Sequence, residues 1–419
     1  MAFRIRLDRL RADLESLNRF GAAQDAPGVN RVSYSDADMA GRRWFMDRLT
    51  AAGLAARMDG VGNVVGRWDA GEGAAVVAGS HLDTVPAGGR FDGALGAVAA
   101  LEAVRTLKEA GLAPRRPIEV IATAEEEGRF GGMLGSQAIV GEAGADWIAG
   151  AADDRGERLA DALGAQGLDA SAAGVARADI ALFLELHIEQ GPRLEAAGLP
   201  IGIVTGVSGV FNWAVTMTGA ANHSGTTPMD MRRDAFRGLA AFGVRIDDIA
   251  ARAGGPETRL TVGKAELSPN FPHSIAGEAR FSIIGRDIDP AGMRRLADAC
   301  RAELASAAET HGLTLAVAEQ SWLPPNPLDA SVADRLAALA AAHGLPHMRM
   351  TSGAGHDAQT FGRHVPAGLI FTPSRGGVSH SPDEDTDWAD IEQAANLLTA
   401  AIAAYAHDRA PPAREGRSP

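Results

Sequence analysis

Two apolar runs with a helical segment between them constrain the fold more than any other feature of this chain. Residues 74–80 and 118–123 have the length and composition of buried strands, and residues 93–110 between them form a helical segment that stops at Gly111. Strands that are apolar on both faces are typical of parallel sheets, because the connecting helices cover both sides. The sequence therefore predicts an α/β fold with a mostly parallel mixed sheet, whose functional residues gather at the C-terminal strand ends.

Further elements extend this unit in both directions along the chain. Ser35 and Ser331 are predicted N-caps, and the helical segment after each one stops at a glycine. The other expected elements are helices at residues 5–20, 35–53, 331–343 and 387–405 and strands at residues 61–68, 182–188 and 368–371.

The pattern changes near Gly206, where a different order of elements begins. Strands are predicted at 207–219, 259–266, 278–284 and 313–318, and helices at 231–253 and 290–307. This βαββαβ order is typical of a small α+β sandwich with an open antiparallel sheet.

A proline-rich segment, Pro324-Pro325-Asn326-Pro327, marks the return to the first domain. We therefore expect a first domain of residues 1–208 and 326–410, interrupted by a smaller domain of residues 209–325. Residues 411–419 are expected to form a disordered tail.

Composition narrows the classes of partner. The chain has 419 residues and a net charge of −13, which argues against nucleic acid and anionic membranes. No apolar run reaches 18 residues, so no membrane span is expected. Cys300 is the single cysteine, so no intramolecular disulfide forms, and the N-terminus lacks a secretory signal pattern. These features favour a cytoplasmic protein.

Five short segments, far apart in the sequence, carry side chains that bind hard divalent metals. They supply three histidines, two metal-facing carboxylates and a spare glutamate. Two metals about 3.5–4 Å apart that share a carboxylate and a water need this mixture. The sequence therefore predicts a two-metal hydrolase. The segments are Gly79–Asp83, Phe91–Gly93, Glu125–Gly128, Glu185–Glu189 and Ser379–Pro382.

Four of the segments suggest a role for one residue each. His81 is expected to offer a ring nitrogen to one metal, while Asp83 accepts its other ring N–H. Asp92 lies in a glycine-rich loop that can fold tightly enough for its carboxylate to bridge both metals. His187 belongs to a polar cluster inside an apolar strand, and His380 lies in a loop of small residues. Each of these residues alone is also consistent with a solvated loop or a satisfied core histidine.

The fifth segment is a run of three glutamates after a predicted strand. Adjacent carboxylates repel one another, so they need a cation or exposure to solvent. Counting from the strand, we assign Glu127 as a metal ligand and Glu126 as the base that moves a proton from water to the leaving nitrogen. A shift of one residue, to Glu125 and Glu126, is the alternative.

Six motifs in order connect these segments to a known family. They are GSHLDTVPAGGRFDG, EEEGRFGG, LELHIEQGP, NHSGTTPM, SGAGHDA and SHSPDE. From about residue 30 to residue 400 the chain resembles the M20-type metallo-amidohydrolases of the hydantoinase/carbamoylase branch. That branch includes N-carbamoyl-L-amino-acid hydrolases, β-ureidopropionases and allantoate amidohydrolases.

The resemblance implies a zinc-peptidase-like catalytic domain, interrupted by a lid domain that also forms a homodimer. It implies one metal held by His81, Asp92 and His187, and another held by Asp92, Glu127 and His380. Zinc or manganese, with cobalt and nickel as further candidates, suits this mixture of ligands.

The resemblance also implies which residues contact the substrate. His223 matches a lid histidine that reaches a substrate oxygen, often across the dimer. Gln190, Asn270 and Arg286 match positions that bind amide and carboxylate groups, and a guanidinium can grip a carboxylate with two hydrogen bonds. Gly353 belongs to a loop, with Ser352, His356 and Asp357, that matches a lining of the site.

The chain departs from the family pattern at three places. The EEEGRF segment is shorter than the usual EEG-x-RF pattern, the segment around Asn270 differs from the usual asparagine-valine-isoleucine-proline-glycine run, and Ile284 replaces an acid. Two of these changes surround the substrate, so they leave its identity open.

The leading hypothesis is a di-metal amidohydrolase that cleaves a linear N-carbamoyl (ureido) acid and releases ammonia and carbon dioxide. An N-carbamoyl-L-amino acid, N-carbamoyl-β-alanine or allantoate would be the substrate. An M20-type dipeptidase or N-acyl amino acid hydrolase is the alternative enzyme. A metal-binding protein without catalysis is a third reading, which the presence of the glutamate run disfavours.

Overall fold

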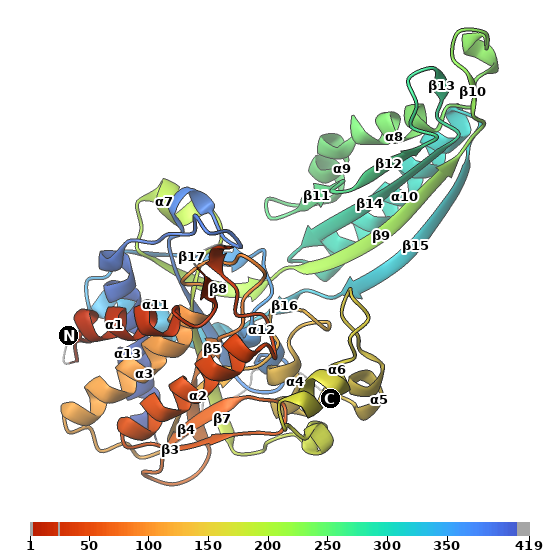
Figure 1. Cartoon of the computed structure of the whole chain (residues 1–419). Coiled ribbons are helices and arrows are strands. Elements are labelled where there is room, and N and C mark those ends of the chain that lie inside the picture. The colour runs from red at the N-terminus through yellow and green to blue at the C-terminus, as the bar shows by residue number, and fades with distance from the viewer. Residues whose placement is uncertain (1–2, 24–25, 409–419) are drawn as a thin grey trace. The chain divides into compact units, whose positions relative to one another are not determined.

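The computed structural model describes residues 3–23 and 26–408, and it forms two compact units (Figure 1). One unit contains the described residues up to Thr205 and those from Leu328 onward, and the other is Gly206–Pro327. The sequence places these limits at 208/209 and 325/326, close to the observed ones. The predicted tail of residues 411–419 lies outside the described residues.

A nine-stranded mixed sheet is the centre of the larger unit. Its four central strands, β18, β7, β5 and β6, run parallel, and antiparallel strands complete both edges. The predicted parallel core is therefore confirmed. The order is β16 (Asn326–Pro327), β8 (Ile201–Val207), β18 (Ala367–Thr372), β7 (Ile180–Ile188), β5 (Ala75–His81), β6 (Ile118–Thr123), β4 (Val64–Trp68) and β3 (Ala55–Met58), with β17 (His347–Ser352) beside β8.

Helices cover both faces of this sheet, because the central strands are apolar on both sides. Leu182, Leu184 and Leu186 of β7 pack into one core with α3 (Ala94–Glu109) and α13 (Trp388–His407). Phe183, which points the other way, stacks on Phe361 of α12 (Asp357–Phe361) with ring centroids 4.0 Å apart. Successive side chains of β7 point to opposite faces of the sheet, so they pack into two separate cores.

The predicted helix caps are partly right. Ser35 caps α2 (Asp36–Ala51), since its hydroxyl accepts a hydrogen bond from the Asp38 N–H at 3.2 Å. The predicted cap at Ser331 is wrong. The carboxylate of Asp329 accepts the first N–H groups of α11 (Ala330–Ala342), so that helix begins one residue before Ser331.

Several short elements in the larger unit were not expected from the sequence. Four of them lie between β6 and β7, where short helices surround a small core that includes Phe130, Leu134 and Leu159. The remaining elements of this unit are α1 (Leu7–Leu17), β1 (Ala22–Ala23), β2 (Ala26–Val29), α4 (Leu134–Val140), α5 (Ala145–Gly150), α6 (Leu159–Ala165), η1 (Ala170–Ala172), α7 (Arg193–Ala197) and η3 (Arg375–Gly377).

The smaller unit has an antiparallel five-stranded sheet with helices packed on it. The predicted first helix begins later, because Asp234 caps it, and it is divided into two. The predicted second strand is also divided into two. The elements are β9 (Gly209–Thr218), β10 (Asn222–His223), η2 (Met229–Met231), α8 (Ala235–Gly243), α9 (Ile246–Ala253), β11 (Arg259–Thr261), β12 (Ala265–Ser268), β13 (Ser274–Ile275), β14 (Glu278–Asp287), α10 (Pro290–Thr310) and β15 (Thr314–Leu323).

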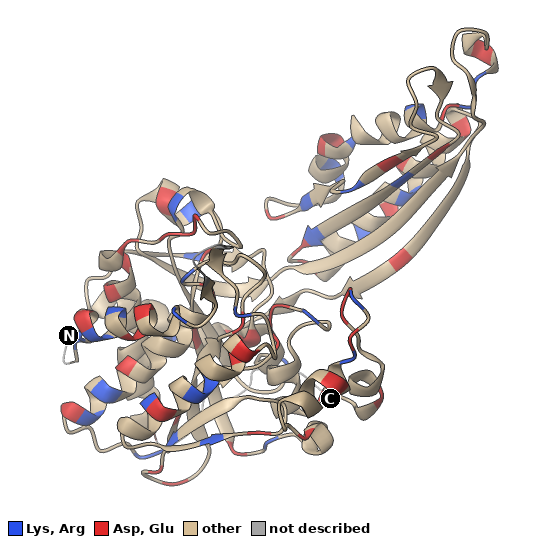
Figure 2. Cartoon of the chain, in the orientation of Figure 1, with Lys and Arg blue, Asp and Glu red and all other residues tan. Residues whose placement is uncertain are grey.

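Charged residues of both signs are interspersed along the elements of each unit (Figure 2). Among the residues that the structure describes, no helix combines the length and the apolarity needed to cross a membrane.

Candidate metal centre

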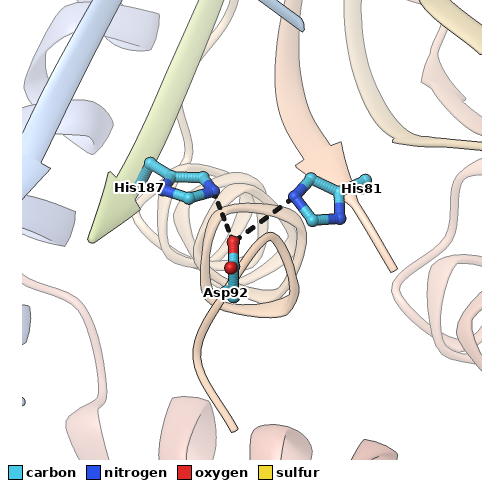
Figure 3. Close-up of side chains that lie close together, drawn as sticks. All are labelled: His81, Asp92 and His187. Atoms are coloured by element: carbon cyan, nitrogen blue, oxygen red, sulfur yellow. Dashed lines mark ion pairs between the residues drawn. The ribbon is translucent and has the colours of Figure 1, made fainter. Parts of the chain in front are cut away.

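Three side chains from separate elements of the larger unit meet at the C-terminal edge of the parallel strands (Figure 3). His81 ends β5, His187 lies near the end of β7, and Asp92 lies in the loop before α3. The Oδ1 atom of Asp92 is 3.0 Å from Nε2 of His187 and 3.6 Å from Nε2 of His81. All three side chains are buried. The sheet thus brings together the three residues that the sequence assigns to one metal.

Backbone carbonyls orient both imidazole rings. Nδ1 of His81 lies 3.0 Å from the Asp83 carbonyl oxygen, and Nδ1 of His187 lies 2.9 Å from the Ile188 carbonyl oxygen. A carbonyl oxygen only accepts, so each Nδ1 carries a proton and each Nε2 is the ring atom left to face Asp92 or a metal. Such orientation is typical of metal-binding histidines.

The expected role of the Asp83 carboxylate is wrong, because the backbone oxygen of this residue is the acceptor. Its carboxylate instead accepts hydrogen bonds from Ser33 Oγ at 2.9 Å, Arg42 Nη2 at 3.3 Å and the Glu127 N–H at 3.1 Å. Asp83 therefore helps to hold the loop that carries the glutamate run.

Asp92 takes part in a second group with Glu127 and His380. Nε2 of His380 is 3.2 Å from Oδ2 of Asp92 and 3.3 Å from Oε2 of Glu127. His380 lies in the loop after η3 with φ 53, and its side chain is half exposed. The two oxygens of Asp92 thus face two different sets of ligands, as a bridging carboxylate does.

The three glutamates after β6 point in different directions. Glu125, with φ 55, accepts hydrogen bonds from the N–H groups of Phe130 at 2.6 Å and Gly132 at 3.0 Å, so it holds its own loop. Glu126 places Oε2 3.6 Å from Nε2 of His81. Glu127 belongs to the group with Asp92 and His380. This arrangement favours the assigned register over the shifted one.

The electrostatics of the cluster favour a bound cation. Burial raises the pKa of Glu126 well above its ordinary value, and burial together with Asp92 raises the pKa of Glu127 to about 7. Burial opposes the ionisation of Asp92, yet hydrogen bonds from His187, His380 and His81 hold its pKa well below the ordinary value. Carboxylates this close together repel one another unless positive charge separates them.

One further atom fits a metal. Oε1 of Glu127 is buried and has no hydrogen-bond partner among the described residues, although a buried carboxylate oxygen almost always has one. A divalent ion would satisfy that oxygen. Imidazole nitrogens and carboxylate oxygens together suit zinc, manganese, cobalt or nickel.

Gln190 lies beside the cluster in the larger unit. Its Nε2 is 2.9 Å from Oδ2 of Asp92 and 3.3 Å from Nε2 of His380, and its backbone has φ 57. Gly353 is exposed in the connection from β17 to α12. In the same connection, the ring of His356 makes a T-shaped contact with the ring of His187, with centroids 4.5 Å apart.

The other predicted substrate residues lie in the smaller unit, where the structure does not bring them together. His223 is on β10, which pairs with β13, and Asn270 precedes β13 with φ 48. Arg286 lies near the far end of β14, eight residues beyond Glu278 (278 to 286). At about 3.3 Å per residue, this run of strand spans about 26 Å. Figure 1 shows β10 and β13 at one end of this sheet and the end of β14 at the other.

Two buried carboxylates near the cluster were missed by the reasoning from sequence. Glu185 accepts hydrogen bonds from Ser80 Oγ at 2.6 Å and from the Ala358 N–H at 2.8 Å. Glu384 accepts from the N–H groups of Phe91 and Asp92. Their positions inside LELHIEQGP and SHSPDE were the only available signals.

The profile of peptidase family M20/M25/M40 matches residues 77–404, which include the whole metal cluster. This chain belongs to that family. An N-carbamoyl-L-amino-acid amidohydrolase of Paenarthrobacter aurescens is 36% identical over 93% of this chain and 96% of the relative. An allantoate amidohydrolase of Escherichia coli K12 is 37% identical over 91% of this chain and 94% of the relative.

A solved structure places this M20 protein in one branch of the family. The amidase of the hydantoinase/carbamoylase family from Burkholderia phymatum superimposes with a TM-score of 0.88 at 38% identity, over 96% of this chain and 98% of that one. The resemblance to this branch and the predicted fold class are therefore confirmed.

Proposed function

We propose that this M20 protein is a di-metal amidohydrolase that cleaves the C–N amide bond of a linear N-carbamoyl (ureido) acid. The observation that carries the proposal is the pair of ligand sets that share Asp92, with the buried Glu126 beside them. Relatives named for N-carbamoyl-L-amino acids and for allantoate, each over more than nine-tenths of this chain, support the class of substrate. The larger unit is the catalytic domain in this proposal.

His81, Asp92 and His187 would hold one divalent ion, and Asp92, Glu127 and His380 would hold another, with zinc or manganese as the leading candidates and cobalt and nickel as further ones. Such a pair of ions supplies Lewis acidity, which lowers the pKa of water and polarises the carbamoyl oxygen. The ligands themselves, fixed on strand ends and loops, set where that chemistry takes place.

Glu126 carries the proton in this mechanism. Its raised pKa suits a carboxylate that takes a proton from the attacking water and then gives it to the nitrogen that leaves. The bond between the carbamoyl carbon and the nitrogen of the acid breaks. The products are the free amino group and carbamate, which decomposes to ammonia and carbon dioxide.

Gln190, Asn270, Arg286 and Gly353 would bind the substrate, with the Arg286 guanidinium on its carboxylate. His223 would donate a hydrogen bond to the oxyanion, a contact whose loss typically costs ~10²–10³ in rate.

A homodimer formed by the smaller unit, residues 209–325, completes the site in this proposal. His223 is on the separate β10–β13 pair, beyond the start of β14, whereas Arg286 lies about 26 Å along β14 from its first residue, Glu278. A ureido acid is far smaller than this distance, so His223 would come from a second copy. Exposed apolar side chains in the smaller unit, Phe236 (51% exposed) and Val244 (80% exposed), offer surface for such an interface.

An ammonia-release screen tests the substrate class. It would cover N-carbamoyl-L-amino acids, N-carbamoyl-β-alanine, allantoate and ureidoglycolate in metal-supplemented protein. Dipeptides and N-acyl amino acids form the comparison set, and because they release no ammonia their hydrolysis is measured as free amino acid. We expect ammonia from at least one ureido acid, and a fall of about 10²–10⁴-fold for Glu126→Gln with unchanged metal content. Turnover of the comparison set alone would instead establish a dipeptidase or N-acyl hydrolase.

A further inference from the structure

Glu384 joins the loop of Asp92 to the loop of His380. Its Oε1 accepts hydrogen bonds from the N–H groups of Phe91 at 2.8 Å and Asp92 at 3.1 Å, and its Oε2 accepts from Ser379 Oγ at 2.9 Å. The side chain is buried, with the whole residue 1% exposed. One carboxylate therefore connects two groups of residues that are almost three hundred positions apart in sequence.

The loop of Asp92 leaves space for the carboxylate of Glu384. A Cβ atom at Gly89 would lie 2.0 Å from the carboxyl carbon of Glu384, so only glycine leaves room for it. Phe91, the residue whose N–H is bound, is itself buried and packs its ring against Trp388 with centroids 5.6 Å apart. The contact between Glu384 and this loop is thus supported by packing as well as by hydrogen bonds.

The two ligand sets differ in how they are held. His81 and His187 lie on neighbouring parallel strands, and backbone carbonyls fix their rings. Asp92 is also anchored without Glu384, since the Leu95 N–H donates to the Phe91 carbonyl at 2.9 Å in the first turn of α3. The set of His81, Asp92 and His187 therefore keeps anchors that do not involve Glu384, although Glu384 also accepts the Asp92 N–H.

Among the described residues, His380 has neither a strand pairing nor a carbonyl partner for its ring, and Nε2 of Gln190 lies 3.3 Å from its Nε2. His380 lies in a loop, its side chain is half exposed, and the adjacent Ser379 hydroxyl is bound by Glu384. An ion pair of Arg90 with Asp385, at 2.9 Å, also joins the two loops, but it is partly exposed and therefore weak. Ser379 Oγ and Nε2 of Gln190 also reach Oδ2 of Asp92, at 3.3 and 2.9 Å, but only the buried Glu384 holds the backbone N–H groups of the Asp92 loop together with Ser379 among the described residues.

We propose that Glu384 is a positioning residue for one metal only, the one held by Asp92, Glu127 and His380. The two ions then bind unequally: the set on the strands fills first, and the set that includes His380 fills second with an affinity that Glu384 controls. This inference rests on the proposed function for the presence of two ions.

Metal titration of the metal-free full-length protein tests this, with Zn²⁺ and Mn²⁺ as probes and calorimetry plus elemental analysis as readouts. For Glu384→Ala we expect the second ion to bind about 10–100-fold more weakly, the loss typical of residues that support ligands, and the first ion to be unchanged. Glu384→Gln should lose less, because its amide oxygen still accepts the two N–H groups.

Two further variants keep the test decisive. Ser379→Ala removes the hydroxyl that joins Glu384 to the loop of His380, and with it two longer contacts, each at 3.3 Å, with Oδ2 of Asp92 and Nε2 of Gln190. It should weaken the second ion even if Glu384→Ala does not fold. Glu119→Ala is the matched control, since Glu119 is equally buried on β6 but is paired with Arg67 and Arg177. It should leave the affinity of both ions unchanged.

The inference is overturned if Ser379→Ala and Glu384→Gln bind the second ion as wild type does, or weaken both ions equally. It is also overturned if wild type binds a single ion. A protein that releases no ammonia from any ureido acid, but shows the unequal loss, would contradict the proposed function and leave the role of Glu384 intact.

Discussion

Nε2 of His380 lies 3.3 Å from Oε2 of Glu127, a contact that brings together residues 253 positions apart (380 minus 127). The loop that carries Glu127 turns the side chain of Glu125 away from this contact, toward the N–H groups of Phe130 and Gly132. The strand β6 ends at Thr123, so the loop conformation after it decides which glutamate faces the cluster. The positive φ of Glu125 is the turn that sends successive carboxylates in different directions.

Glu127→Ala should therefore remove one metal ion per chain, because it removes a ligand and leaves His81, Asp92 and His187 in place. Glu125→Gln is the control. This variant should keep both ions. Its free energy of unfolding should fall by about 1–3 kcal/mol, because the glutamine NH₂ group would face one of the two buried backbone N–H groups and two donors cannot bond each other. Elemental analysis and chemical denaturation measure these effects. Loss of an ion from Glu126→Gln, with both ions kept in Glu127→Ala, would establish the shifted register.

Gly93→Ala should disturb the metal cluster directly. A Cβ atom there would lie 2.3 Å from Cε1 of His81, and the backbone has φ 61. Gly111→Ala is the matched control, because Gly111 has φ 73 and nothing within 4 Å of its Cβ position. Both variants should lose about 1–2 kcal/mol of stability from backbone strain. Only Gly93→Ala should also lose metal, and equal metal content in the two would contradict the predicted clash.

Binding of the second ion should release protons. The hydrogen bond between His380 and Asp92 raises the pKa of His380 to about 9. Burial raises the pKa of Glu127 to about 7. Both groups must lose their protons to bind metal, so affinity should rise with pH through 7 and up to about 9. In the metal-free protein the sign is opposite for His380: its ion pair stabilises the fold fully below about 6.5 and is lost as pH rises toward 9.

Calorimetry in buffers with different ionisation enthalpies measures this release at pH 6.5 and pH 8. His380→Ala should release fewer protons at pH 8. An affinity for the second ion that does not change between these two pH values would contradict the assignment of His380 and Glu127 as ligands.

A hybrid dimer tests whether His223 acts across the interface. His223→Ala and Glu126→Gln should each be nearly inactive alone. If His223 serves the partner's site, a mixed dimer has one complete site, so an equal mixture should recover about a quarter of wild-type ammonia release. Recovery requires subunit exchange, which co-expression with two affinity tags ensures. No recovery in the isolated hybrid would place His223 in its own chain's site or outside any site.

The sequence predicts the central strands well, because apolar runs mark buried strands. The set of His81, Asp92 and His187 is implied by the family resemblance, and the structure brings these three side chains together. The sequence does not predict contacts that depend on tertiary packing. Glu384 meets Phe91 and Asp92 only after both loops fold, and nothing local in SHSPDE indicates this.

Competition between neighbouring polar groups explains two other differences between the predictions from sequence and the structure. Asp329, whose carboxylate accepts the N–H groups of Ser331 and Val332, starts α11 in place of Ser331. The carboxylate of Asp83 is occupied by Ser33, Arg42 and Glu127, so the backbone oxygen of Asp83 holds His81 instead. In both places a sequence pattern identifies a polar residue correctly, while the folded structure decides which of its atoms is used.

Anomalous diffraction from crystals grown with Zn²⁺ or Mn²⁺ tests the central claim most directly. Two anomalous peaks about 3.5–4 Å apart should flank the carboxylate of Asp92, one beside His81 and His187 and the other beside Glu127 and His380. A single peak, or two peaks that do not share Asp92, would contradict the proposed di-metal centre.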